Sequence, residues 1–498
     1  MFSCMELKTR HASEVCSNTH RVDYLHLTKR FGIVAASQLP IHYLLSAKTP
    51  YNPIQLITVL SHEELNPYHR LLGRIITTFF SMHAVLYLNF YVQASLLAKR
   101  IRDSDVQLGL AAIICFFIIG TSALSVVRTY SYHLFYIIHI TLSPSVLVIL
   151  YFHVSYIRIY ILETAAVFVV LSLQRYYLHQ QLIHASLTPI PNTSLVAISI
   201  KSPKSTNRYT YFPGQHIYLS SIRNRKSFSR STSMNPYSIA NLPFQDTKNI
   251  QFIVRKLNGA TKSLGLLARD RPERPLPFIM ERPYGAAKNF PDLLSYDVVL
   301  LVAGGVGATF TLPIYRALIH RISNRRPSLI RGHRQPNDED ITTDSQSQEH
   351  AENMELLDLA GTDDDILHTV PSIPRIHFTW SVRNRQAAQW GLDALENSQE
   401  NPLSPALTDF KLHITGSTTA PPSTNSPPTP FTTIINHRRP DLRTLVDDTF
   451  SSSEQSLGKR VAVLVCGPAG LGRDLKREVE RWVASDREVW WHEERFGW

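Results

Sequence analysis

Long apolar runs dominate the chain between residues 69 and 178. Four of them are each long enough to cross a hydrocarbon core of about 30 Å at about 1.5 Å of helical rise per residue. They cover residues 71–91, 107–127, 133–155 and 158–178. A weaker stretch, 31–47, contains Pro40 and fits either a fifth span or an interfacial segment. The pattern predicts a multi-pass α-helical membrane domain over 31–180, in contact with lipid.

The first 30 residues are polar and lack the basic start and apolar core of a signal peptide. We therefore treat 1–30 as a separate N-terminal segment.

Beyond about residue 185 the hydrophobic pattern shortens into β-rich runs separated by turn residues. Three such runs lie near 195–200, 211–221 and 249–257, and they predict an antiparallel β-barrel over 185–292. From residue 297 an apolar strand leads through a glycine turn into a helix, which is typical of a nucleotide-binding α/β unit. Further strands near 375–382 and 461–466 extend this α/β domain over 293–498. The fold class is a helical transmembrane bundle followed by a barrel and an α/β domain.

Two polar inserts interrupt the α/β domain, near 321–374 and 396–434. The first holds eleven Asp or Glu and no Lys or Arg between residues 335 and 366, and the second is rich in Pro, Ser and Thr. Neither has enough apolar residues to form a core, so both are predicted to be disordered loops.

The net charge and the cysteine count limit the kinds of molecule that the chain is expected to bind. The 498-residue chain carries a net charge of +11, which suits a phosphorylated cofactor or an anionic membrane surface. The positive charge is dispersed and no nucleic-acid-binding motif accompanies it, so nucleic acid is not expected. Four scattered cysteines do not predict a disulfide scaffold or a zinc site.

Histidines inside the apolar helices are the strongest chemical signal, because an ionisable residue in a spanning segment is costly. His69 and His83 are fourteen residues apart, and so are His139 and His153. Fourteen residues make about 3.9 turns, so each pair shares one helix face with about 21 Å between its members. Two such helices could hold two six-coordinate hemes. The alternative is that each histidine bonds a neighbouring carbonyl. His42 and His133 have no partner at this spacing and are interpreted as structural.

Two turns could approach a dinucleotide. Gly304, Gly305 and Gly307 follow an apolar strand and open a helix, where backbone amides can bind a pyrophosphate. Cys466, Gly467 and Pro468 follow another strand at the usual ligand edge of such a sheet. A tight structural turn without a ligand is the alternative for the glycine turn.

Taken together, several motifs resemble the fungal ferric/cupric reductase transmembrane components, a family related to the NADPH oxidases. The resemblance covers about 21–320, 375–395 and 435–498. The motifs, in order, are NPYHRLLGRIITTFFSMH, FPGQHIYLSS, MNPYSIANLP, VRKLNGATKSL, ERPYGA, LLVAGGVGATFTLPIYRAL, CGPAG and ERFGW.

The resemblance implies specific cofactor contacts. His69 and His139 would ligate an inner b-type heme, and His83 and His153 an outer one. FAD would lie along Phe212, Pro213, Gly214, Gln215 and His216, and along Asn235, Pro236, Tyr237 and Ser238, where Asn235 replaces the usual His. The turn of Pro283, Tyr284 and Gly285 would border the same cofactor, with Arg282 in place of the usual Gly.

For the second cofactor, the resemblance implies that Gly304, Gly305, Gly307, Ala308 and Thr309 bind the NADPH pyrophosphate. Cys466, Gly467 and Pro468 would lie beside the nicotinamide, and Trp498 would cover the flavin until the nicotinamide displaces it. Cys466 and Trp498 are therefore the expected catalytic residues. Members of the family have at least six spanning helices, so the four or five seen here imply an N-terminal truncation.

The implied function is electron transfer from cytosolic NADPH through FAD and two b-type hemes to extracellular ferric or cupric chelates, at the plasma membrane. A superoxide-generating NADPH oxidase is one alternative, and a truncated, inactive membrane paralogue is another. The oligomeric state is left open.

Overall fold

The computed structural model describes most of the chain. The described residues are 24–49, 51–179, 181–201, 211–221, 234–243, 249–331, 373–396, 407–416, 433–451, 460–485 and 487–495. They divide into two compact units, a helical one that ends at His179 and a mixed one that begins at Gln180.

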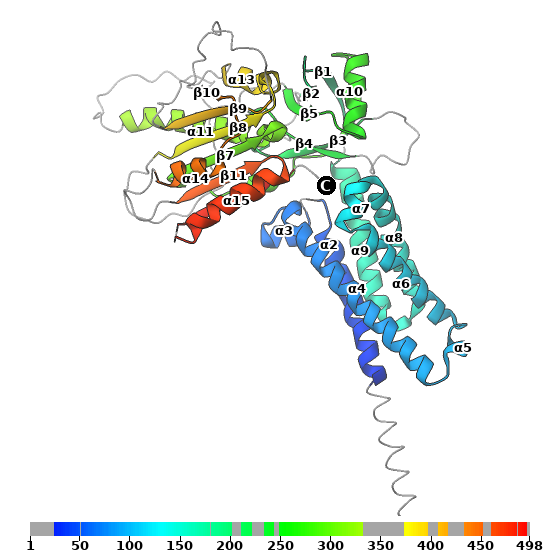
Figure 1. The fold of residues 1–498 in the computed structure, drawn as a ribbon. Coiled ribbons are helices and arrows are strands. Elements are labelled where there is room, and N and C mark those ends of the chain that lie inside the picture. Colours follow the sequence, from blue (N-terminus) through cyan, green and yellow to red (C-terminus); the bar gives the residue numbers. More distant parts are fainter. Residues whose placement is uncertain are drawn as a thin grey trace, which may run out of the picture. The chain divides into compact units, whose positions relative to one another are not determined.

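The helical unit consists of long helices that run side by side (Figure 1). A helix over 24–37 is followed by α2 (Leu39–Leu45), α3 (Pro53–Thr58), α4 (His62–Gln93), α5 (Leu97–Arg100), α6 (Ser104–Ser122), α7 (Ser125–Tyr130), α8 (Tyr132–His153) and α9 (Arg158–Gln174). Short 3-10 and π-helical turns, Ser155–Ile157 and Arg175–His179, flank α9. The start of α4 is fixed by a capping box between Ser61 and Glu64.

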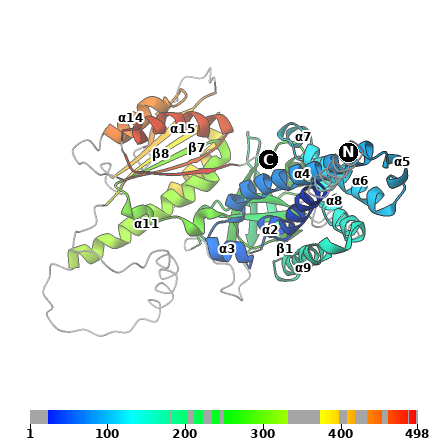
Figure 2. The ribbon, with the colours of Figure 1, turned by 90° about the horizontal axis from the view of Figure 1, so that it is seen from below.

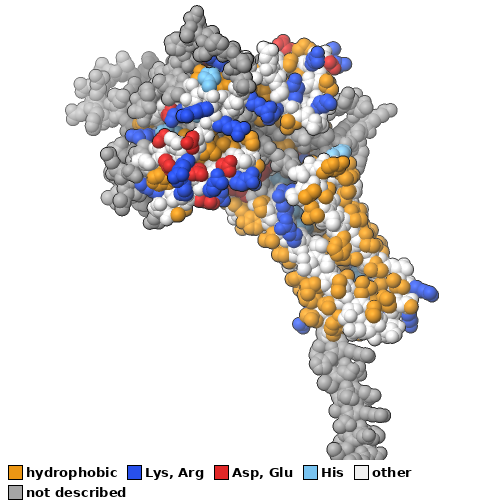
Figure 3. All heavy atoms as spheres, in the orientation of Figure 1, with side chains coloured by type: hydrophobic (Ala, Val, Ile, Leu, Met, Phe, Trp, Pro, Cys, Tyr) orange, Lys and Arg blue, Asp and Glu red, His pale blue; other side chains and the backbone are white. Residues whose placement is uncertain are grey.

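Four described segments are long and apolar enough to cross a membrane: His62–Gln93, Ser104–Ser122, Tyr132–His153 and Ser155–Tyr177. Hydrophobic side chains predominate on the visible face of this unit (Figure 3), and Val85 and Phe152 are each 62% exposed. The predicted helical membrane region is therefore confirmed. The weaker stretch 31–47 is divided at Gln38, where the first helix ends and α2 begins with Pro40 in its first turn.

Small side chains bring the first helix close to the others. Ala35 and Ala36 are fully buried in a core that also contains Ile76 of α4, Phe116 of α6 and Leu147 of α8. Small residues at helix interfaces allow backbones to approach closely in a membrane bundle.

The mixed unit begins with an antiparallel sheet. Its strands are β1 (Gln181–Pro189), β2 (Leu195–Lys201), β3 (His216–Ser221), β4 (Asn235–Ser238), β5 (Asn249–Arg255) and β6 (Leu276–Met280), in the order β4-β3-β6-β1-β2-β5. Helix α10 (Ala260–Asp270) contributes Leu264 and Ala268 to the core of this sheet. The predicted antiparallel β domain is confirmed.

A parallel sheet of order β10-β9-β8-β7-β11-β12 completes the unit. Its strands are β7 (Val298–Gly304), β8 (Arg375–Val382), β9 (Thr408–Ile414), β10 (Thr433–Asn436), β11 (Val461–Cys466) and β12 (Val489–Glu494). Helices α11 (Ala308–Arg331) and α13 (Gln389–Glu396) pack on one face, and α14 (Leu442–Ser451) and α15 (Ala469–Val483) pack on the other. Figure 2 shows α11 on the opposite side of the sheet from α14 and α15. Because both faces are covered, β7 and β11 are almost entirely apolar.

The sequence interpretation of the inserts is wrong in part. Within the expected loop 396–434, residues Thr408–Ile414 form β9, which lies between β8 and β10. The apolar residues Phe410, Leu412 and Ile414 are buried there, but the surrounding Pro, Ser and Thr residues hide this short alternation. The first eleven residues of the other insert, 321–331, also belong to α11. Residues 332–372, 397–406 and 417–432 lie outside the described part of the chain.

Candidate functional site

Helices α4 and α8 bring the four predicted histidines together in two pairs. The rings of His69 and His139 have centroids 6.2 Å apart and planes inclined by 69°. This separation leaves room for two metal–nitrogen bonds of about 2 Å each, together with the two ring radii. His83 and His153 line a second location, a common cavity farther along the same helices.

Three of the four rings are fixed through Nδ1 by a main-chain carbonyl on another helix or its end. Nδ1 of His83 lies 2.8 Å from the oxygen of Thr28, and Nδ1 of His153 lies 2.6 Å from that of Asp105. Nδ1 of His69 lies 3.1 Å from the oxygen of His42. A carbonyl accepts only, so Nδ1 carries the proton and Nε2 keeps its lone pair for a metal ion.

His139 differs from the other three. Its Nδ1 is buried and has no hydrogen-bond partner among the described residues. The alternative interpretation, in which each histidine only bonds a neighbouring carbonyl, therefore holds for Nδ1 of three of the four rings. It does not involve Nε2 of those rings, which remains able to bind a metal ion.

Glycines on neighbouring helices make room for the rings. A Cβ on Gly32 would lie 2.8 Å from Nδ1 of His83, and a Cβ on Gly109 would lie 2.7 Å from Cε1 of His153. Any larger residue would displace the imidazoles, so backbone packing sets the position of both rings.

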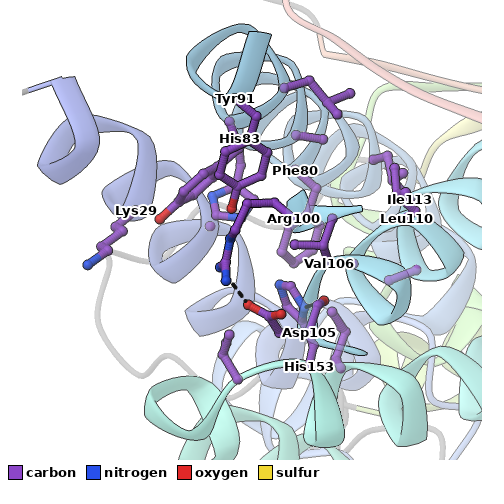
Figure 4. Close-up of a pocket in the computed structure, with 18 of the residues that line it drawn as sticks. Lys29, Phe80, His83, Tyr91, Arg100, Asp105, Val106, Leu110, Ile113 and His153 are labelled. Atoms are coloured by element: carbon purple, nitrogen blue, oxygen red, sulfur yellow. Dashed lines mark hydrogen bonds and ion pairs between the residues drawn. The ribbon is translucent and has the colours of Figure 1, made fainter. Parts of the chain in front are cut away.

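The cavity that contains His83 and His153 has a volume of about 460 Å³, in the range of cofactor pockets. Its wall is mostly apolar, with Phe80 and Leu110 inside and Lys29, Arg100 and Asp105 among its charged residues (Figure 4). Arg100 binds the Asp105 carboxylate at 3.1 Å. Asp105 thus orients His153 through its carbonyl and holds Arg100 through its side chain.

The donor set fits hemes better than bare metal ions. No described group of three or more His, Cys, Asp or Glu could hold a metal ion. Two imidazoles at each location could together hold a heme iron, whose macrocycle would supply the remaining ligands.

The predicted flavin residues meet at the edge of the antiparallel sheet. Strands β3 and β4 pair so that His216 is opposite Ser238, and Ile217 opposite Tyr237. Asn235 and Pro236 occupy the first half of β4. The turn before β3 is closed by Gln215, whose Oε1 accepts a bond of 2.9 Å from the Phe212 amide, with Pro213 and Gly214 between them.

Two observations in this region fit a bound flavin. The Ser238 hydroxyl is buried without a hydrogen-bond partner among the described residues, so it can donate to a cofactor. Burial raises the pKa of Tyr237, so this side chain stays neutral.

The predicted turn of Pro283, Tyr284 and Gly285 lies beside the same strand. Tyr284 pairs with His216. Gly285 has a φ of +114°, and a Cβ added there would lie 3.2 Å from the His216 ring.

The two turns of the parallel sheet are interlocked. A Cβ on Gly307 would lie 2.2 Å from the carbonyl oxygen of Cys466, and one on Gly304 would lie 2.7 Å from Cδ of Pro468. A Cβ on Gly467 would lie 3.0 Å from the Cα of Gly304. The predicted pyrophosphate and nicotinamide turns therefore lie side by side at the carboxyl ends of β7 and β11.

The start of α11 completes the turn. Gly305 forms part of a 3-10 turn, Ala308 is fully buried, and the Thr309 hydroxyl donates to the carbonyl of Val306 at 2.8 Å. Trp380 of β8 donates to the Gly305 carbonyl at 2.8 Å and fixes the turn from the other side.

Cys466 is buried and lies opposite Glu494 in the pairing of β11 with β12. Burial, and then the charges of Glu494 and Glu493, raise the pKa of its thiol well above the usual range. The neutral thiol is a small apolar surface rather than a nucleophile. Trp498, the predicted flavin cover, lies outside the described residues.

Family models match the chain in three consecutive parts. A ferric reductase like transmembrane component matches 31–150, an FAD-binding domain matches 181–288, and a ferric reductase NAD binding domain matches 296–480. The chain has the three-domain architecture of the ferric reductases. A flavin and a pyridine nucleotide are thereby assigned to the mixed unit.

Curated fungal relatives agree with this architecture. A "probable metalloreductase" of Candida tropicalis is 27% identical over 59% of this chain and 50% of its own length. A "probable metalloreductase" of Yarrowia lipolytica is 28% identical over 58% and 51%. A "probable ferric reductase transmembrane component" of Eremothecium gossypii is 26% identical over 61% and 46%. The chain spans about half the length of the curated relatives it matches.

Replacing Gly109 with Ala should expel or tilt His153, because the new Cβ would lie 2.7 Å from its ring. On the heme assignment that the resemblance implies, we expect the heme content per chain to fall, by up to one of the two hemes, in a pyridine hemochrome assay. Gly120→Ala on the same helix is the matched control, since nothing lies within 4 Å of its Cβ. Equal heme content in the two variants would contradict the role of Gly109.

Cys466 should resist alkylation in the folded protein, because its raised pKa leaves little thiolate at about pH 8. We expect iodoacetamide to label Cys466 only after unfolding, as read by peptide mass spectrometry. The half-buried Cys115 is an internal comparison in the same sample. Rapid labelling of Cys466 in the folded protein would show that the thiol is accessible and activated.

Proposed function

We propose that this ferric reductase transfers electrons across the plasma membrane, from cytosolic NADPH through FAD and two b-type hemes to ferric or cupric chelates outside. In this way it supports iron or copper uptake. The proposal goes beyond the three domains, which by themselves establish a membrane protein with a flavin and a pyridine nucleotide.

The observation that carries the proposal is the paired histidines of α4 and α8. Both pairs lie in one apolar bundle, and three of the four rings have Nδ1 bound to a carbonyl, so that Nε2 is free. One pair faces across 6.2 Å, and the other lines a cavity of cofactor size. Two sites along the same helices are what stepwise transfer across a bilayer requires.

Each group of residues has a separate task. When bound, FAD exchanges two electrons with the nicotinamide and the hemes carry single electrons. The interlocked turns of β7 and β11 would bind the dinucleotide by main-chain amides. The Ser238 hydroxyl would orient the flavin, and the neutral Cys466 thiol would pack beside the nicotinamide without reacting.

Charged residues of the outer cavity favour a metal chelate as acceptor. Lys29 and Arg100 line the cavity that holds His83 and His153, and chelated ferric ions are often anionic. Only Arg100 of these two cations has an ion pair with a described carboxylate. Superoxide formation is the competing outcome, which the assay below separates.

The choice of NADPH over NADH is argued from the end of β8. Ser381 lies beside Gly304 in the pairing of β7 with β8, so Arg383 and Arg385 follow directly next to the dinucleotide turn. Neither arginine has an ion pair with a described residue. An arginine at this place in a dinucleotide fold can accommodate a 2′-phosphate.

His69→Leu and His153→Leu should each remove an axial ligand and interrupt electron transfer. We expect loss of b-type bands in dithionite-reduced minus oxidised spectra of membranes, and at least about a 100-fold fall in ferric-chelate reduction. His133→Leu, at an exposed position, is the control. Full reduction by either stably inserted ligand variant would refute the assignment, and superoxide-dismutase-sensitive activity would favour the oxidase.

Arg383→Ala and Arg385→Ala should weaken NADPH binding while sparing NADH. Loss of a charged hydrogen bond costs about 1.5–3 kcal/mol, or roughly a 10–100-fold rise in KM. Arg375→Ala, at the opposite end of β8, is the matched control. Stopped-flow flavin reduction with both nucleotides measures the effect, and equal losses for NADPH and NADH would exclude a role in 2′-phosphate recognition.

A further inference from the structure

His42 of α2 has a relation to the inner histidine pair that its position in the sequence does not reveal. Its ring stacks on that of His69, with centroids 4.1 Å apart and planes inclined by 10°. Its carbonyl is also the acceptor for Nδ1 of His69 at 3.1 Å. One residue therefore contacts the same ligand ring by its face and by its edge.

The surroundings of His42 are shaped for an imidazole. A Cβ on Gly73 of α4 would lie only 3.0 Å from Cε1 of His42, so glycine makes room for the ring. Nδ1 of His42 is buried and has no hydrogen-bond partner among the described residues. A histidine with only a structural role would normally form a hydrogen bond through Nδ1. The stacking contact with His69 therefore explains the presence of a histidine at position 42 better than a structural role does.

The next residue ties α2 to the opposite ligand helix. The Tyr43 hydroxyl donates to the carbonyl of Ser143 on α8 at 2.7 Å. The Ser143 hydroxyl in turn donates to the carbonyl of His139 at 2.6 Å. Contacts therefore run from His69 through His42, Tyr43 and Ser143 to His139, and α2 joins both members of the inner pair.

Among the residues that the structure describes, His83 and His153 are the histidines that line the outer cavity, and no third imidazole stacks on either of them. There, His83 and His153 pack directly on the backbone at Gly32 and Gly109. At the inner pair, His42 fills the corresponding space beside His69 and itself packs on a glycine. The difference is specific to one of the two sites.

We propose that His42 is a positioning residue that fixes the ring plane of His69 and thereby tunes the inner of the two heme sites. The proposal rests on the function proposed above. The planes of His69 and His139 are inclined by 69°, and the stack on His42 prevents the His69 ring from rotating toward its partner. The relative orientation of two axial imidazoles affects both the reduction potential and the electron paramagnetic resonance (EPR) spectrum of a low-spin ferric heme.

The experiment compares His42→Leu, which removes the planar ring, with His42→Phe, which keeps a planar stacking partner and the same carbonyl. The full chain is studied in membranes or detergent, with His133→Leu as the control. Heme per chain, the ferric EPR spectrum and the midpoint potentials of both hemes are measured.

We expect all variants to keep two hemes, because no ligand is removed. In His42→Leu one of the two low-spin signals and one of the two potentials should shift, whereas His42→Phe should restore both toward the parent values. The other heme should be unchanged throughout.

Parent-like signals and potentials in His42→Leu, with two hemes bound, would overturn the role of His42 and leave the proposed function intact. Equal shifts of both hemes would also overturn it, since the effect would then not be local. A parent protein that binds no heme would refute the proposed function and this inference together. Loss of one heme in His42→Leu but not in His42→Phe would also support the proposal, because it would show that His69 needs a planar stacking partner in order to bind its heme.

Discussion

The arrangement of the helical unit depends on three hydrogen bonds, each from an imidazole Nδ1 to a main-chain carbonyl. Each bond fixes the ring, sets the tautomer and directs Nε2 away from the helix that supplies the carbonyl. The carbonyls belong to Thr28, His42 and Asp105, on three segments that carry no proposed ligand. The bundle can therefore place two ligand helices correctly only if these neighbours pack closely, which is why glycine and alanine occur where they meet.

The mixed unit also depends on a close backbone approach, here between two strand ends rather than between helices. There the backbones of two parallel strands approach so closely at their carboxyl ends that Gly307 cannot carry a side chain. The contact joins the turn proposed for pyrophosphate to the turn proposed for nicotinamide. In both units glycine thus allows a close backbone approach, to an imidazole ring in the helical unit and to a second turn in the mixed unit.

Periodicity in the sequence was sufficient to predict the long helices, the antiparallel and parallel sheets and the paired histidines, because each follows from local spacing. The carbonyl partners of the histidines could not be predicted, since they lie 27, 48 and 55 residues away along the chain. His42 was interpreted as structural because its relation to His69 arises only when α2 folds back against α4. Strand β9 was missed because its seven residues are flanked by segments of low complexity.

Because the strands are parallel, two connections of the α/β domain enter the sheet at the edge opposite its glycine turns. Segments 332–372 and 397–406 lead into β8 and β9 at their amino ends, whereas the glycine turns lie at the carboxyl ends of β7 and β11. A change in the sequence that leads into β8 or β9 therefore joins the fold at the edge opposite the turns proposed for the dinucleotide.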